Sequence, residues 1–167
     1  LDALNKKKET AATAAQKSDY EKLDKEADQL TQVAEVLLKD GENSLFEQAK
    51  TSGDNQKVYD SIEKLFASYN STLKELRNTS NTMNNFYRQM LLEAPDEVKE
   101  NLSGVGITFA KDGTASIDME KVKAADFEIL EGLFGKESDF VQKIEFLSTR
   151  ISDNAEANVE SLGNAYN

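Results

Sequence analysis

The sequence predicts a mainly α-helical fold: an elongated antiparallel bundle or coiled coil of long helices with one small β-hairpin. Apolar residues recur at spacings of three and four in three stretches, at about 2–39, 55–92 and 138–162, and such spacing marks one face of a helix. The 167-residue chain is only 38% hydrophobic and 31% charged, which suits a thin bundle with little interior. One short stretch with strand-like alternation, at 106–118, interrupts the helical pattern.

The first predicted helix spans residues 2–39 and ends at the "KDG" of 39–41. Gly41 is suited to the position just after a helix, where a left-handed residue is common. The apolar side of the helix is a heptad seam, the pattern by which long helices pack together. The seam consists of Tyr20, Leu23, Ala27, Leu30, Ala34 and Leu37.

A connection at 40–54 leads to the second predicted helix, at 55–92. Within the connection, Ser44 and Glu47 have capping-box spacing and predict a short helix. The two long helices, at about 1.5 Å per residue, would each be roughly 57 Å long. Matched lengths joined by one connection predict an antiparallel helical hairpin.

The seam of the second helix is wider than that of the first. On this register Asn70 faces outward and has no evident role. The main seam consists of Ile62, Leu65, Tyr69, Thr72, Leu76, Thr79, Met83, Phe86 and Met90. Further apolar positions at Val58, Phe66, Leu73, Tyr87 and Leu91 widen it. A wide apolar stripe indicates contact with more than one neighbour.

The methionines and aromatic residues of this stripe allow two interpretations. They can form the core of the bundle, or they can form a surface for a partner helix or another subunit, a role that methionine suits. Both interpretations stay open at this stage. Packing or assembly is therefore the predicted role of Leu23, Leu30, Leu37, Ile62, Tyr69, Leu76, Met83, Phe86 and Met90.

Between the second and third long helices, residues 93–136 predict short helices and the hairpin, forming a compact end of one elongated domain over 1–167. Pro95 begins a short helix, and Asp118 and Asp126 are suited to cap two others. The third long helix, at 138–162, would lie against the first two. Its stripe consists of Phe140, Ile144, Leu147, Ile151, Ala155, Val159 and Leu162.

The Asp112-Gly113 pair in the hairpin stretch raises the question of a calcium loop. An EF-hand has glycine at its sixth position, acids at the first and third, and glutamate at the twelfth. Counted from Gly113, those three ligand positions hold Thr108, Ala110 and Met119, and none of them fits. The pair is instead typical of a hairpin turn with a glycine at positive φ. In that hairpin Ile107 and Phe109 would face the same side as Ala115 and Ile117.

Composition excludes several classes of function. The net charge of −11 argues against binding to nucleic acid or to anionic lipid, which both need lysine and arginine. The absence of His and Cys removes the commonest general base and the commonest metal ligands. The dense carboxylates at 118–131 are expected to form a solvated face. We expect no enzymatic activity, no cofactor, no metal and, without a long apolar run, no membrane insertion.

Three stretches of the chain resemble a known family. They are "VYDSIEKLFASYNSTLKEL" (58–76), "GVGITFAKDGTASIDMEKVKAA" (104–125) and "LEGLFG" (130–135). Together they look like the C-terminal helical part of bacterial flagellar hook-associated protein 2, the filament cap. The matching positions are Phe66, Tyr69, Asn70, Gly106, Ile107, Thr108, Lys111, Asp112, Gly113, Thr114, Asp118, Leu133, Phe134 and Gly135. The family usually has a Leu-rich second strand, where this chain has Ala115.

The resemblance implies a structural component of the bacterial flagellum. It implies an extracellular protein, exported without a cleaved signal peptide, that assembles with itself or with other flagellar axial proteins through long helices. The family usually carries a head domain made of strands, and residues 40–54 are too few to hold one, so the resemblance extends to the leg region alone. The alternative is a helical adaptor or export chaperone that binds a partner helix through the Met and aromatic stripe.

Overall fold

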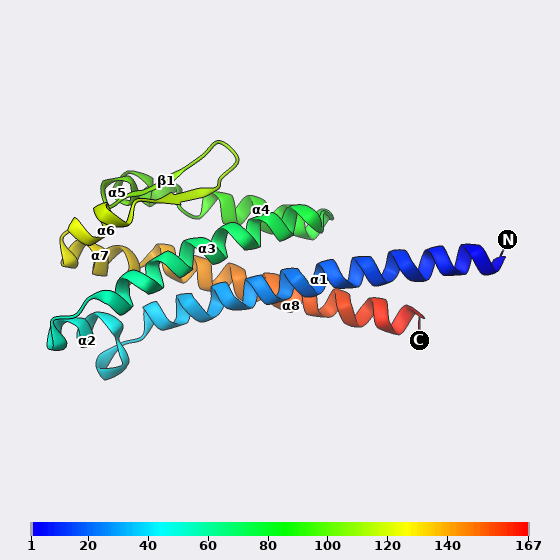
Figure 1. Ribbon diagram of the computed structural model, residues 1–167, viewed down its shortest axis with the longest axis horizontal. Helices are drawn as coiled ribbons and strands as arrows, with labels where there is room; N and C mark the ends of the chain where they lie inside the picture. Colours follow the sequence, from blue (N-terminus) through cyan, green and yellow to red (C-terminus); the bar gives the residue numbers. More distant parts are fainter. Residues whose placement is uncertain (1, 167) are drawn as a thin grey trace.

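The computed structural model describes the backbone of residues 2–166 and the side chains of residues 13–163. It confirms a mainly helical, elongated fold with one two-stranded antiparallel hairpin (Figure 1). In the described part of the chain, no helix is both long enough and apolar enough to cross a membrane.

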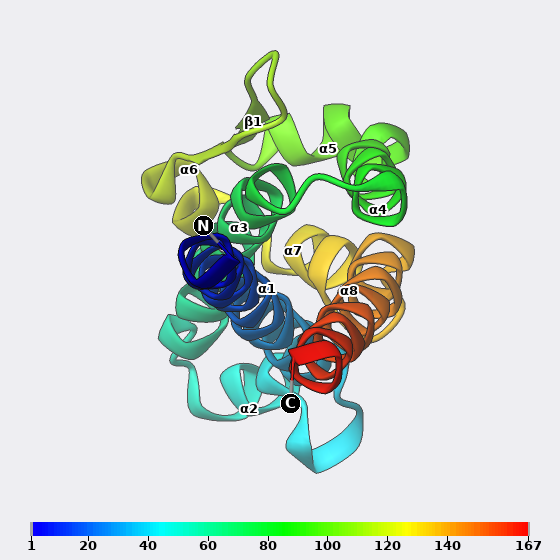
Figure 2. The ribbon, with the colours of Figure 1, turned by 90° about the vertical axis from the view of Figure 1, so that its right-hand side faces the viewer.

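Three long helices form the body of the molecule. They are α1 (Asp2–Leu38), α3 (Gln56–Asn78) and α8 (Asp139–Tyr166). Helix α1 runs antiparallel to both α3 and α8 and packs most extensively against α8 (Figures 1 and 2). Both ends of the chain therefore lie at the same end of the bundle.

The predicted seam of α1 is confirmed, because all six of its residues, from Tyr20 to Leu37, are buried. A polar contact joins the same interface. The hydroxyl of Thr31 donates to Oγ of Ser148 on α8 over 2.7 Å, and both side chains are buried. Since buried hydroxyls are costly without partners, this pair also fixes how α1 and α8 align.

The prediction of one continuous second helix at 55–92 is wrong. The chain forms α3 and then a separate helix, α4 (Thr82–Glu93), which turns back beside α3 (Figure 1). Asparagine, threonine and serine between the two helices are responsible, since their side chains hydrogen-bond the backbone and favour helix ends.

Polar side chains satisfy the backbone at this break. The hydroxyl of Thr79 donates to the carbonyl of Glu75 over 2.7 Å as α3 ends. Oδ1 of Asn81 accepts from the amide of Asn84 over 2.8 Å and so caps α4. The side chain of Asn84 is buried and its Nδ2 donates to the carbonyl of Thr79 over 2.8 Å. The amide of Asn81 also donates to the Tyr20 hydroxyl over 3.0 Å.

Short elements fill the two connections. They are the 3₁₀ helices η1 (Gly41–Asn43) and η2 (Asp96–Val98), the helices α2 (Leu45–Ser52), α5 (Lys99–Gly104), α6 (Met119–Ala124) and α7 (Phe127–Phe134), and the strands β1 (Ile107–Phe109) and β2 (Ala115–Ile117). The predicted caps Ser44, Asp118 and Asp126 each accept a hydrogen bond from the first turn of their helix. Gly41 has the predicted left-handed φ, +65°, but it does not directly follow α1 and instead begins η1, capped by Asp40.

The hairpin alternates as predicted. Ile107 pairs with Ile117 and Phe109 with Ala115, and these four lie on the side that faces the core, while Thr108 between them is exposed. At the turn, Oδ1 of Asp112 accepts from the amide of Thr114 over 2.9 Å, and Gly113 has a φ of +90°. The turn therefore has the chemistry of a hairpin loop.

A second glycine is as constrained as the one in the turn. Gly106 has a φ of +102°, and a Cβ there would lie 2.7 Å from the backbone oxygen of Asp118. The carbonyl of Gly106 accepts from the amide of Asp118 over 2.8 Å, which closes the base of the hairpin. This close approach of two backbones requires glycine.

Candidate interaction surfaces

The hairpin is attached to α3 by one asparagine. Nδ2 of Asn70 donates to the carbonyl of Ala115 over 2.9 Å, and Oδ1 of Asn70 accepts from the amide of Ala115 over 2.8 Å. The prediction that Asn70 faces outward without a role is wrong. The prediction considered only apolar side chains as contacts, whereas α3 packs against β2 on this side through the polar side chain of Asn70.

An aromatic cluster lies beneath the hairpin. The ring of Phe66 is its centre, with centroid distances of 5.9 Å to Phe134, 6.1 Å to Phe140 and 6.3 Å to Phe109. Tyr69 joins it at 6.1 Å from Phe109. Three of the resemblance residues, Phe66, Tyr69 and Phe134, are thus part of one cluster.

Tyr69 is a packing residue with a satisfied hydroxyl. Its side chain is buried and the hydroxyl donates to the carbonyl of Leu91 on α4 over 3.0 Å. Burial, together with the negative charge of Asp96, raises the pKa of Tyr69 well above its usual value. The other predicted packing residues of α1 and α3 are buried too: Leu23, Leu30, Leu37, Ile62 and Leu76.

Three predicted seam residues lie on the surface instead. Met83 is 49%, Phe86 57% and Met90 39% exposed, so their interpretation as core is wrong. The break before α4 turns this helix so that Asn84 and Leu91 face the core. The three side chains stay on one face of α4, at the spacings of three and four predicted from the sequence.

Phe146 of α8 extends this apolar surface. It is 57% exposed, and the guanidinium of Arg150 lies 4.2 Å from the centroid of its ring. Phe146 and Met90 line the same hollow between α4 and α8. We call Met83, Phe86, Met90 and Phe146 the apolar patch. Sequence reasoning missed Phe146, although an aromatic residue off the stripe of α8 was the available signal.

The hollow beside the apolar patch has a volume of about 640 Å³ and an acidic border. Leu147 and Ala94 contribute to its floor. The carboxylates come from the end of α4, from η2 and from the start of α8. They are Glu93, Asp96, Glu97 and Asp139, and Lys143 is the one cation among the lining residues.

The ends of α1 and α8 form a second exposed feature. Beyond the contact of Tyr20 with Asn81, both helices continue past the end of the α3–α4 layer (Figure 1). We call this part, residues 2–19 of α1 and 155–166 of α8, the terminal pair. Among its described apolar side chains, Ala155 is buried, whereas Val159 and Leu162 are only half-buried.

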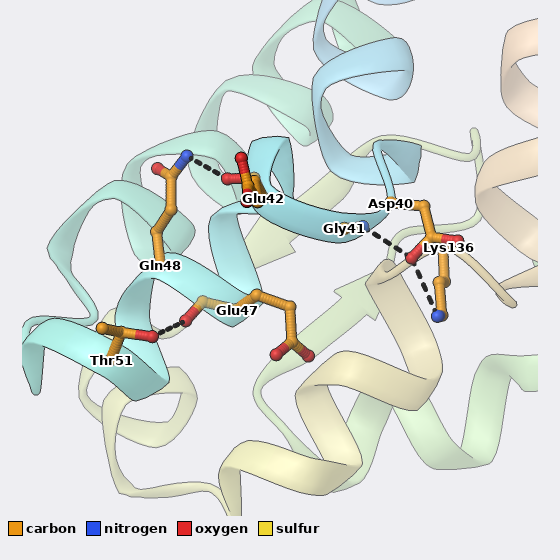
Figure 3. A pocket seen from close by; sticks show the side chains of 7 residues that line it. All are labelled: Asp40, Gly41, Glu42, Glu47, Gln48, Thr51 and Lys136. Atoms are coloured by element: carbon orange, nitrogen blue, oxygen red, sulfur yellow. Dashed lines mark hydrogen bonds and ion pairs between the residues drawn. The ribbon is translucent and has the colours of Figure 1, made fainter.

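An acidic hollow lies at the corner between α1 and α2 (Figure 3). Nζ of Lys136 is 2.9 Å from Oδ1 of Asp40, and this hydrogen bond, with that from Gly41, lowers the pKa of Asp40. The nearby Nζ of Lys50 lies 2.6 Å from Glu131, which raises the pKa of Lys50.

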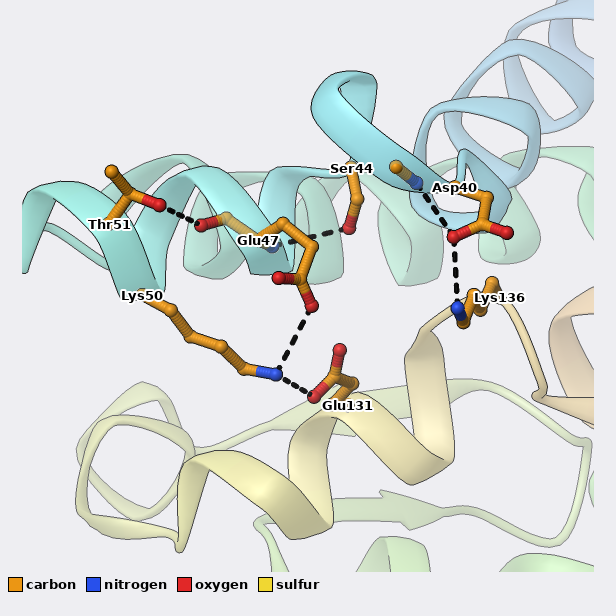
Figure 4. Close-up of polar contacts among 8 residues, drawn as sticks. Asp40, Ser44, Glu47, Lys50, Thr51, Glu131 and Lys136 are labelled. Carbon is orange, nitrogen blue, oxygen red and sulfur yellow. Dashed lines mark hydrogen bonds and ion pairs between the residues drawn. The ribbon is translucent and has the colours of Figure 1, made fainter.

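These two ion pairs connect the α1–α2 corner to α7 and the residues that follow it (Figure 4). All four groups are partly or largely exposed, and such pairs contribute little to stability. The described part of the chain contains no group of three or more side chains placed to hold a metal ion.

Comparisons with known proteins found no match to this chain among family models, curated proteins or solved structures. The functional argument therefore rests on the two exposed features above, the terminal pair and the apolar patch, and on the residues of the family resemblance.

Proposed function

We propose that this chain is a structural, non-enzymatic module of the bacterial flagellum, which acts by helix-mediated assembly as the leg region of a filament cap does. The observation on which this depends is the terminal pair, where two long helices extend together past the rest of the bundle (Figure 1). On this proposal the protein is extracellular, reaches the flagellum without a cleaved signal peptide, and associates with itself or with other axial proteins.

The terminal pair is suited to association because it is incompletely covered. Two helices bury the narrow seam between them but leave the edges of a wider apolar stripe exposed, and further elements can cover those edges. Val159 and Leu162 remain half-buried there. A further helix, from another copy or from another axial protein, would complete their burial.

The flagellar part of the proposal rests on the sequence resemblance, and the structure shows where the resemblance residues lie. The structure provides a physical role for several positions shared with the cap family. They are the amide of Asn70, the aromatic ring of Phe134 and the backbone contact between Gly106 and Asp118. The Asn70 contact attaches the hairpin to α3, the Gly106–Asp118 contact closes the base of the hairpin, and Phe134 of α7 packs against Phe66 of α3.

The alternative proposal, a helical adaptor or export chaperone, is favoured by the apolar patch. Met83, Phe86 and Met90 present one exposed apolar face on α4, and methionine-rich faces adapt to partner helices. Localisation separates the two proposals. An axial protein is recovered in filaments sheared from flagellated cells, whereas a chaperone stays in the cytosol.

The experiment combines that fractionation with light scattering of the purified chain over a range of concentrations. We expect recovery in the sheared filaments and a mass that rises with concentration. Leu162→Glu would place a charge in the terminal pair and should keep the mass at that of a monomer with unchanged helicity. The matched control Glu160→Gln changes an exposed residue of the same helix. A cytosolic chain of constant mass would contradict the proposal.

A further inference from the structure

We propose that the hollow between α4 and α8 binds a basic amphipathic helix of another protein. This inference names the partner of the apolar patch and rests on the proposed binding role of that patch. It does not depend on association through the terminal pair. Three features of the hollow lead to it: the grouping of exposed apolar side chains, the sign of the charges around them and the shape of the face.

The apolar patch contains four of the five large hydrophobic side chains that are exposed in the described part of the chain. Of these four, Met90 and Phe146 line the hollow, whereas Met83 and Phe86 continue the exposed face of α4. The fifth exposed residue, Ile129, lies on α7. Single exposed apolar residues are common, but a group of them marks a binding surface. Two of the four are methionines, whose flexible side chains fit irregular partner surfaces.

The charges around the hollow favour a partner with a positively charged surface. Four carboxylates and one lysine line it, and the guanidinium of Arg150 lies beside it on the ring of Phe146, so carboxylates outnumber cations by four to two. That lysine, Lys143, is 3.7 Å from Glu97, and Asp96 is 3.2 Å from Lys99 outside the hollow. Glu93 and Asp139 have no ion-pair partner among the described residues.

This charge pattern disfavours the other simple occupants. A second copy placed face to face would bring carboxylates against carboxylates, in a chain whose net charge is −11, and like charges across an interface are costly. An anionic lipid surface would be repelled in the same way. Lysine or arginine on a partner protein would instead complement the border.

The shape of the face fits a helix. Helices α4 and α8 run antiparallel here, with Nδ2 of Asn154 3.4 Å from Oδ1 of Asn84. Met83 to Met90 is seven residues, so the α4 part of the patch is about 10 Å long, or two helical turns. A partner helix with apolar residues at i, i+3 or i+4, and i+7 would cover it. Its basic residues would face the end near Glu93 and Glu97.

The experiment uses two designed peptides and the full chain. Each peptide is an amphipathic helix of about 14 residues, long enough to cover the patch, with leucine at i, i+3 and i+7. One has lysine and the other glutamate on its flanks. Fluorescence anisotropy measures their binding at low and high salt. We expect the lysine peptide to bind at least about tenfold more tightly than the glutamate peptide. The difference in affinity should decrease at high salt.

Variants locate the site. Phe146→Gln with Met90→Gln should weaken the lysine peptide at least about tenfold, as removal of central apolar contacts does. Glu93→Gln with Glu97→Gln should weaken the lysine peptide and leave the glutamate peptide unaffected or slightly tighter. The control Ile129→Gln removes an equally exposed apolar side chain elsewhere and should leave binding unchanged.

The inference is overturned if the two peptides bind equally, if neither binds, or if Ile129→Gln weakens binding as much as the patch variants do. Its failure is distinct from that of the assembly proposal. The patch variants should still associate with rising concentration, and Leu162→Glu should still bind the lysine peptide. Helicity measured by circular dichroism shows that each variant is folded.

Discussion

At the residue scale, the amide of Asn70 joins elements 45 residues apart in the chain. It forms both hydrogen bonds to the backbone of Ala115 and leaves neither backbone group unpaired on that side. The site is half-buried, so water replaces these bonds poorly. The same residue is part of the family resemblance, which makes its physical role of direct interest.

We predict that Asn70→Ala lowers the free energy of unfolding by about 1–3 kcal/mol, because two backbone groups lose their partner. Urea denaturation followed by circular dichroism measures the change. The exposed Asn101 of α5 provides a control: Asn101→Ala should change stability by less than about 0.5 kcal/mol. Equal effects of the two substitutions would show that the Asn70 contact does not stabilise the fold.

Tyr69 predicts a dependence of stability on alkaline pH. Its raised pKa means that the folded chain keeps a proton that the unfolded chain releases above about pH 10. The stabilising effect is therefore complete below pH 10 and is lost as the pH rises above it, by up to about 1.4 kcal/mol per pH unit.

Tyr69→Phe separates this effect from the hydrogen bond to Leu91. At pH 8 the variant should be less stable by about 1 kcal/mol, the usual net value of a hydrogen bond. At about pH 11 the difference should narrow or reverse, because phenylalanine has no proton to lose. Tyr87→Phe, in a half-buried ring beside Phe86, controls for removal of a hydroxyl at pH 8. A difference that is constant with pH would contradict the prediction.

Residue-level prediction succeeded where the local sequence decides the geometry. Asp118 and Asp126 cap their helices, and Gly113 has a positive φ in its turn, because caps and turns depend on neighbours in the chain. Asn70 and Gly106 were missed as contact residues. Their roles depend on segments that meet only after folding, and no local pattern records them.

At the element scale, the break between α3 and α4 has the largest effect on function. A heptad pattern runs through it, since Leu76, Thr79 and Met83 keep the spacing of a single helix. The polar residues at the break outweigh that pattern by hydrogen-bonding the backbone. As a result, the end of the predicted seam becomes the exposed face of α4.

We predict that Asn84→Ala destabilises the protein more than Asn81→Ala does. Asn84 is buried and its loss leaves the carbonyl of Thr79 without its partner, at a cost of about 1–3 kcal/mol. Asn81 supplies a helix cap, worth typically about 1 kcal/mol. Thermal unfolding by calorimetry measures both. The reverse order would show that the cap, and not the buried amide, holds the break.

At the scale of the whole molecule, the predicted match in length between the first two long helices is wrong, since α1 has 37 residues and α3 has 23. Their antiparallel order could be predicted from periodicity and from the connection between them. The extent of the layers could not. Helix α3 ends at Asn78 and the chain turns back, so the α3–α4 layer is shorter than α1. Because of this difference in length, the terminal pair consists of two helices, whereas the body of the bundle has more. The sequence of a single helix does not predict how far the neighbouring layer extends.

More helices pack against the first part of α8 than against its last turns, and this difference predicts a gradient of local stability along α8. Backbone amides of 144–151 lie where α8 contacts α1 and α4, whereas those of 158–162 lie in the terminal pair. Hydrogen exchange followed by mass spectrometry should show slow exchange, close to the limit of global unfolding, in the first segment. The second should exchange by local opening, because few buried contacts hold it.

Assembly through the terminal pair would change this gradient in a specific way. At high protein concentration the amides of 158–162 should become protected, since opening would then require dissociation, while those of 144–151 stay as they were. Leu162→Glu should abolish the protection gained with concentration and leave the first segment unaffected. Exchange of 158–162 that is slow even in dilute solution would mean that the pair is already complete in a single chain, and that association uses another surface.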